Sequence, residues 1–143
     1  MPTAARRAHG TLLKIGDGGG TEAFTTIAEV LDISGGGYEV MTEDATSHDS
    51  SGWYESAPTL KKGQEVTFDL LYSSATTQDT LETDQGNLTR RNFQLVMTPA
   101  TGVTDTRAFA AYIKNVELQA PVAGLLRMSV TLEPTGAVTK TIS

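Results

Sequence analysis

Apolar and polar residues alternate strictly through residues 64–73 of this chain, QEVTFDLLYS. Because successive side chains of a strand point to opposite faces of a sheet, this pattern predicts a strand with one buried face and one face toward water. The apolar face carries Val66, Phe68, Leu70 and Tyr72. The polar face carries Glu65, Thr67 and Asp69.

The same period predicts further strands downstream. Residues 126–133 place Leu126, Met128, Val130 and Leu132 on one face. Phe93, Leu95 and Met97 form a third apolar face, which we expect to end at Pro99 because proline has no N–H to donate to a ladder. In residues 107–118 the apolar phase changes after Ile113, and this slip predicts a bulge near Lys114 or Asn115.

Two strands are also expected near the start, over residues 11–15 and 26–33. They flank the turn GDGGGTEAF, where glycines allow positive φ without steric cost. A phosphate-binding loop at residues 16–20 is the alternative, but the GxxxxGK[ST] motif that such a loop needs is missing. A hairpin turn is therefore the preferred interpretation.

One segment, residues 76–87, predicts a short helix. Thr77 is the expected N-cap, and Asp79 and Glu82 lie in the first turns, where the helix dipole favours negative charge. Gly86 or Asn87 offers a left-handed stop. Leu81 is the one strong apolar residue of this segment, so we expect it to pack on the flanking strands.

Composition limits the class of protein. A chain of 143 residues fits a single domain, here residues 1–143 with a short N-terminal arm (1–9) and a C-terminal segment (137–143). No apolar run approaches the ~18 residues of a membrane-spanning helix, and residues 1–16 lack the apolar core of a secretion signal, so synthesis and residence in a cytoplasm are expected. With no cysteine and two histidines, we expect no disulfide, metal site or cofactor. The net charge of −6 argues against sequence-independent DNA binding.

Residues 44–62 show no sustained period and predict one long loop. Within it, TSHDSSGWYES at 46–56 contains Ser, His and Asp, the residue types of a hydrolase triad. Neighbouring residues of an extended chain point to opposite sides, so His48 and Asp49 cannot readily build a triad with an adjacent serine, and no GxSxG motif is present. We expect no catalytic residue. Large apolar groups amid Ser, Asp and Gly instead favour a loop that is buried against a partner.

The order of these features resembles the tail tube (major tail) proteins of long, non-contractile bacteriophage tails. The resemblance extends from Gly10 to Gly136 and rests on GTLLKIGDG, TTIAEVLDISGGGYEV, TSHDSSGWYESAPTLKKGQEVTFDLLY, RNFQLVMT, AYIKNVELQAP and SVTLEPTG. The TSHDS block before a strand of the EVTF type is its most specific part. Residues 51–56 depart from the family pattern, in which a proline and glycines often stand there.

The resemblance implies a mainly β fold, a two-sheet β-sandwich or barrel with one short α-helix. It implies that six copies close into a ring and that rings stack into a hollow tube in a virion tail, with tail tip, tape measure and tail terminator proteins as partners. DNA would pass through the tube without specific binding, and no membrane is involved. We expect the polar face of the strand at residues 64–73, with Glu65, Thr67 and Asp69, to line the lumen. Glu65 and Asp69 would make this wall acidic, and an acidic wall repels phosphate.

The long loop is then expected to be an assembly loop between rings. Trp53 is its main contact, because tryptophan is enriched at interface hot spots. His48, Asp49, Tyr54 and Leu60 are lesser members of this predicted surface. Three other readings stay open: a monomeric β-sandwich module that binds glycan or peptide through Trp53 and Tyr54, a secretion-system tube protein, and a hydrolase that uses His48.

Overall fold

The computed structural model describes residues 6–18 and 22–143. The tip of the expected glycine turn (19–21) and most of the expected N-terminal arm (1–5) lie outside these residues. The elements in chain order are β1 (Leu12–Gly16), β2 (Phe24–Thr26), β3 (Val30–Ser34), β4 (Tyr38–Asp44), β5 (Ser56–Gly63), β6 (Val66–Leu71), α1 (Thr76–Asn87), β7 (Arg90–Ala100), β8 (Val103–Gln119) and β9 (Arg127–Ile142).

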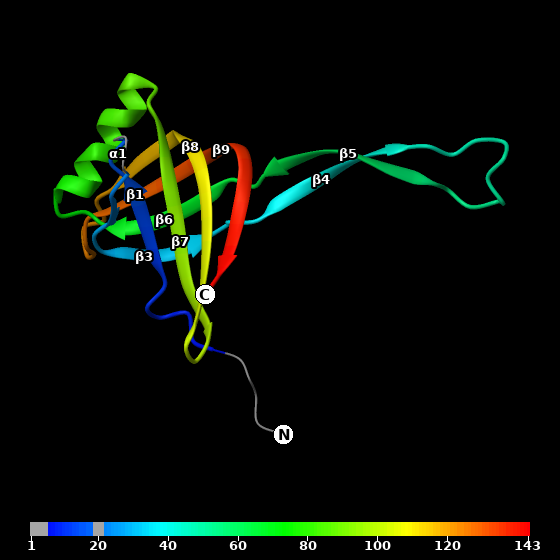
Figure 1. The fold of residues 1–143 in the computed structure, drawn as a ribbon. Helices are drawn as coiled ribbons and strands as arrows, with labels where there is room; N and C mark the ends of the chain where they lie inside the picture. Colours follow the sequence, from blue (N-terminus) through cyan, green and yellow to red (C-terminus); the bar gives the residue numbers. More distant parts are fainter. Residues whose placement is uncertain (1–5, 19–21) are drawn as a thin grey trace.

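Seven strands form one antiparallel sheet in the order β2-β1-β7-β8-β9-β6-β3. The sheet curls around a single core, with α1 against one side (Figure 1). The remaining two strands, β4 and β5, pair only with each other and project from this body as a long ribbon (Figure 1). The mainly β fold class with one short helix is confirmed for the described residues.

The core follows the alternation in the sequence. Val66, Phe68 and Leu70 of β6 are completely or almost completely buried, and they face the buried side chains of β9 across an antiparallel register in which Phe68 lies opposite Val130. Phe93 of β7 stacks on Phe109 of β8, with ring centroids 5.8 Å apart. Period-2 apolar positions thus identify the strands that have one buried face.

The phase change in β8 is a bulge, as predicted. The register between β8 and β9 slips between Ile113 and Asn115, so Lys114 has no residue directly opposite. Here β8 leaves the side of β7 and continues with β9 alone. The amide of Gln85 in α1 donates to the Lys114 carbonyl at 3.4 Å, so the helix covers part of this free edge.

Two expected strands have different boundaries. Residues 26–33 do not form one strand: β2 ends at Thr26 and β3 begins at Val30, with Glu29 at a φ of 56° between them. The chain passes there from one end of the sheet order to the other, β2 beside β1 and β3 beside β6. Pro99 does not end its strand either, because β7 continues to Ala100 through an irregular register.

The C-terminal segment 137–143 is not a separate piece. It belongs to β9, whose second half pairs with β8 as far as Ile142 opposite Asp105. Leu126, expected in the core, is exposed just before β9 because the chain is still turning there. The strand starts one residue later than predicted, at Arg127, and its first buried residue is Met128.

The helix bounds 76–87 match the prediction, but its caps do not. Ala75 is the N-cap and has no side-chain cap bond, while the hydroxyl of Thr77 accepts a hydrogen bond from the backbone of Ala28 at 3.2 Å. Leu88, with a φ of 58°, provides the left-handed C-cap instead of Gly86 or Asn87. Thr77 therefore joins the helix to the turn between β2 and β3.

Candidate assembly surfaces

The β4–β5 ribbon, called the arm below, is the most distinctive feature of the structure. Its strands pair from Tyr38 opposite Gly63 at the base to Asp44 opposite Ser56 near the tip, with one register shift between Val40 and Thr42. The prediction of one loop over residues 44–62 is thus wrong for Asp44, which ends β4, and for residues 56–62, which form most of β5. The sequence does not predict β4 and β5 as strands, because neither has a buried face that would require apolar residues at alternate positions.

Glycines set the base of the arm where the chain enters and leaves it. Gly36 has a φ of 90°, and a Cβ on it would stand 2.9 Å from a methyl carbon of Leu95. A Cβ on Gly63 would stand 2.9 Å from Pro134 in β9. Glycine is therefore the residue that suits both positions, 36 and 63. These close contacts fix the direction in which the arm leaves the body.

The arm exposes an unusual amount of apolar surface. Every residue of β4 is exposed, including Val40 and Met41, and Leu60 on β5 is 68% exposed. A two-stranded ribbon without a hydrophobic face packed on other elements is marginally stable in water. The arm therefore has the composition of a surface that is completed by another molecule.

The tip, residues 45–55, is closed by hydrogen bonds among small polar residues. The Thr46 amide donates to the Asp44 carboxylate at 2.9 Å, and these bonds to Thr46 lower the pKa of Asp44. The Ser47 amide donates to the Ser50 hydroxyl at 3.1 Å, and that hydroxyl donates to the Glu55 carboxylate at 2.8 Å. The Ser and Asp residues of this sequence thus hold the shape of a turn.

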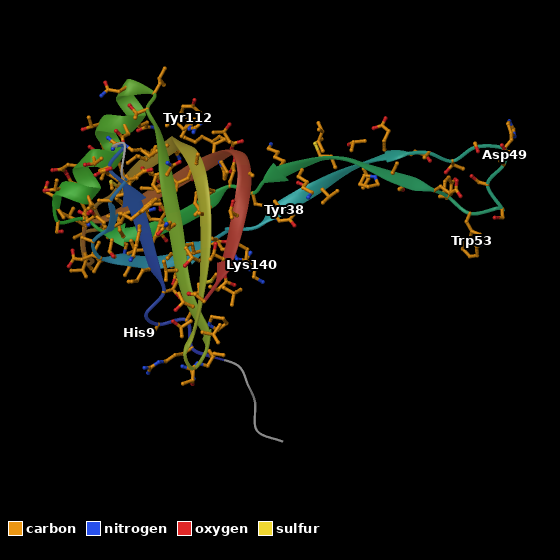
Figure 2. All side chains as sticks on the ribbon, in the orientation of Figure 1. His9, Tyr38, Asp49, Trp53, Tyr112 and Lys140 are labelled. Carbon is orange, nitrogen blue, oxygen red and sulfur yellow. The ribbon has the colours of Figure 1, made fainter. Side chains whose placement is uncertain are left out.

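These bonds leave the aromatic side chains free. Trp53 is 80% exposed and Tyr54 is 90% exposed, and Figure 2 shows Trp53 directed away from the ribbon near the far end of the arm. His48 and Asp49 are exposed in the same turn. Leu60 lies on β5 and so belongs to the shaft of the arm, apart from the tip.

A hydrolase site does not assemble here. The hydroxyl of Ser50 is bonded to Glu55 and to the Ser47 amide, with no bond to His48. His48 is an exposed turn residue next to Asp49 in the sequence, and Figure 2 shows Asp49 at the far end of the ribbon, away from the body that could orient a catalytic ring. Among the described residues no group of three potential metal ligands occurs, and no helix is long and apolar enough to cross a bilayer.

The three lumen candidates lie on the outward face at β6. Thr67 is exposed, while Asp69 is half-buried and accepts a hydrogen bond from Ser129 on β9. Glu65 is bonded to the Lys114 ammonium at 2.5 Å, and this bond lowers the pKa of Glu65 and raises that of Lys114. Glu65 therefore carries a charge that its neighbour offsets.

The ion pair of Glu65 belongs to a small network. Lys114 also lies 3.8 Å from Glu133, which lies 4.0 Å from Lys62 at the base of the arm. Two carboxylates and two ammonium groups balance, so this part of the face is close to neutral. Exposed pairs of this kind add about 0–1 kcal/mol each to stability.

The helix is held by its buried side chains, of which sequence reasoning identified one. Leu81 is fully buried, and so is Gln78, whose amide bonds three backbone groups: Ser73 N–H at 2.9 Å, Leu71 C=O at 2.9 Å and Ala28 C=O at 3.1 Å. Asp84 pairs with Arg91 of β7 through two bonds, at 2.8 and 3.1 Å. Residues 78, 81 and 84 recur every third position, and that helical spacing was the available signal.

Comparisons with known proteins found no matching protein-family model and no matching curated protein. Solved structures do match. A chain from the tail of an empty GTA particle, described with C6 symmetry, has a TM-score of 0.79 at 20% identity, over 96% of this chain and 99% of that chain. The SPP1 tail tube has a TM-score of 0.69 at 13% identity, over 98% of this chain and 78% of that chain.

A third match is a chain from the sheath–tube complex of an extracellular contractile injection system, PVC, with a TM-score of 0.65 at 12% identity over 100% of this chain and 90% of that chain. One of these three structures is described with a contractile sheath, and the other two are not. At sequence identities of 20% or less, the matches establish a shared fold only. The curled sheet, its flanking helix and the projecting arm together give this chain the tail tube fold.

Proposed function

We propose that this protein is the repeating structural subunit of a phage-like tail tube. The observation that carries the proposal is the arm, a ribbon with two exposed aromatic residues at its tip, whose two strands pair with each other alone among the described strands. Its fold is that of the SPP1 tail tube, and the similar GTA tail has C6 symmetry. An isolated subunit leaves this surface in water, whereas a repeating assembly buries it in every copy.

The proposed assembly is a stack of hexameric rings. A ring needs two different patches that meet head to tail and close by rotation, and a stack needs a further contact along the axis. In this proposal the arm makes the contact between rings, with Trp53 as its main residue and His48, Asp49, Tyr54 and Leu60 beside it. The subunit resides in the particle tail, is made in a host cytoplasm, and meets tail tip, tape measure and tail terminator proteins at the tube ends.

The tube would conduct DNA without binding it. A net charge of −6 disfavours adhesion of phosphates to the wall. Glu65, Thr67 and Asp69 remain the proposed lumen residues, with Asp69 the stronger source of negative charge because Lys114 offsets Glu65. A structure of the assembled tube tests this choice: if these side chains lie on the outer surface or between subunits, the assignment is wrong.

Electron microscopy of the purified protein at high concentration tests the proposed function. We expect rings or hollow tubes without any added ligand. A protein that stays monomeric at all concentrations would contradict the proposal. The proposal includes no enzymatic activity, and His48→Ala should have a smaller effect on assembly than Trp53→Ala.

A binding module is the second candidate, and one observation favours it. The tip has an open depression of about 300 Å³ lined by Trp53, Tyr54 and four small residues. This volume lies at the lower end of the ~300–1,000 Å³ range of ligand-binding pockets. Thermal melts with glycan and peptide panels distinguish the two functions. Ligand-dependent stabilisation of a monomer supports the module, and ligand-independent polymers support the tube subunit.

A further inference from the structure

A groove opens on the body between the N-terminal segment and β3. Its volume is about 540 Å³, and Val30, Leu31 and Ile33 of β3 form one wall. Leu95 and Met97 of β7 lie deeper, and residues 8–11 form the other wall. Because β3 is the last strand of its sheet, its second edge has no strand partner in the described residues. The groove thus places apolar side chains of β3 and β7, with polar ones from His9, Thr11 and Asp32, beside a strand edge that is unpaired in the described residues.

Two arginines lie next to one wall of this groove in the chain. Arg6 and Arg7 directly precede the lining residue Ala8, and both are exposed. Arg6 donates to the Thr101 hydroxyl at 3.1 Å, which holds the segment against the β7–β8 turn. Asp32 is the one carboxylate among the lining residues. The two arginines beside residues 8–11 favour an anionic occupant at that wall.

The tip of the arm has the complementary character. Residues 43–55 contain four carboxylates and no Lys or Arg: Glu43, Asp44, Asp49 and Glu55. The same turn projects Trp53 and Tyr54, at 80% and 90% exposure. Each aromatic residue can bury about 150–250 Å² when it enters an apolar site. The arm thus ends in an acidic, aromatic knob.

Knob and groove of one chain do not meet. In Figure 2, Trp53 stands at the far end of the arm, while His9, a lining residue of the groove, lies on the opposite side of the body. A contact between them must therefore join two copies. Because the two surfaces differ, the contact is heterologous and can repeat from copy to copy without limit, as a tube requires.

We propose that the groove between residues 8–11 and β3 receives the arm tip of a neighbouring subunit, with Trp53 against Leu31 and Ile33 and the acidic turn beside Arg6 and Arg7. The inference rests on the proposed tube function and identifies the receptor surface within it. It adds contact residues in the N-terminal segment and β3 that the exposed arm by itself does not indicate.

The β8–β9 connection is another apolar surface that could receive the tip. The β8–β9 connection exposes several large side chains: Leu118, Val122, Leu125 and Leu126. Residues 119–126 contain no Lys or Arg, and one exposed arginine, Arg127, follows them, so this connection has fewer positive neighbours than the wall at residues 8–11. Compared with this connection, the groove is favoured as the site for an acidic knob, because it is hollow and two arginines adjoin it in the chain.

Disulfide trapping tests the pairing cleanly, because the natural chain has no cysteine. We would mix two single-cysteine proteins, Ser51→Cys at the tip and Leu31→Cys in the groove, allow assembly, and oxidise mildly. Leu12→Cys is the matched control, since Leu12 and Leu31 are both 39% exposed. Leu125→Cys reports on the competing surface. Denaturing gels without reductant then count the covalent dimers.

We expect Ser51→Cys to cross-link with Leu31→Cys and to give at most background dimer with the other two partners. Assembly without this cross-link, or a preferred bond to Leu125→Cys, overturns the groove while leaving the tube function intact. Failure of the unsubstituted protein to assemble at all would instead remove the proposed function and the inference together.

A charge exchange gives a second readout that needs no cysteine. Arg7→Glu and Asp49→Lys should each raise the concentration needed for assembly by a few-fold, as removal of one exposed charge pair does. The double variant should recover part of this loss, since the pair is restored with reversed sign. Additive losses without recovery would overturn the proposed proximity of the two residues.

Discussion

Gln78 is a residue whose environment gives it an unexpected role. It is polar, yet it is fully buried, and its amide satisfies three backbone groups that would otherwise be unpaired where α1, β6 and the turn after β2 meet. An unsatisfied buried group costs about 1–3 kcal/mol, so this one side chain sets the position of the helix.

Replacing Gln78 tests that role. Gln78→Leu keeps the volume but removes all three bonds, and we expect a loss of at least about 2 kcal/mol in the free energy of unfolding. Urea unfolding measures it. Gln85→Leu is the control, because Gln85 makes a single long bond of 3.4 Å. Equal effects of the two substitutions would show that the buried amide contributes nothing special.

Leu81 is the apolar counterpart of Gln78. It is fully buried under α1, so Leu81→Ala should lower the free energy of unfolding of the monomer by about 2–5 kcal/mol. Leu88→Ala makes the same substitution at an 81% exposed site just after the helix and should cost little. A monomer whose melting midpoint is unchanged by Leu81→Ala would contradict the observed packing.

At the scale of elements, predictability from sequence follows burial. β6 and the first half of β9 were predictable because each has one face in the core, which forces apolar residues onto alternate positions. The bulge at Lys114 was predictable because the core face changes phase there. The helix bounds were predictable because the segment lies outside the alternating pattern and begins and ends with polar residues.

The arm could not be predicted as two strands. Both faces of the ribbon are exposed to water, so apolar and polar residues need not alternate. The two strands contain Thr, Glu and Lys with scattered apolar residues. The groove was missed for a different reason. It combines residues 8–11, 30–35 and 95–97, which come together only when the sheet curls.

The arm should be dispensable for folding. Tyr38 lies opposite Gly63 at its base, so residues 39–62 can be replaced by Asn-Gly, a sequence suited to a two-residue hairpin turn. We expect the shortened protein to keep the melting midpoint of the monomer and to form no tubes. Calorimetry and electron microscopy check the two outcomes. A large loss of stability would show that the arm belongs to the core.

At the scale of the whole molecule, body and arm divide the work of the proposed tube subunit. The body holds the buried apolar residues and folds around one core. The arm carries exposed Trp53 and Tyr54 on a ribbon fixed by close glycine contacts at its base. Stability and assembly therefore depend on different residues, and substitutions should separate the two.

The polymerisation of Trp53→Ala tests the central claim most directly. Truncating an interface hot spot costs at least about 2 kcal/mol, which raises the concentration needed for assembly about thirtyfold, and a tube repeats this loss in every subunit. With His48→Ala as the control at the same tip, sedimentation and electron microscopy should show no tubes for Trp53→Ala and an unchanged melting midpoint for its monomer. Normal tubes from Trp53→Ala, or a monomer that unfolds without this side chain, would contradict the account.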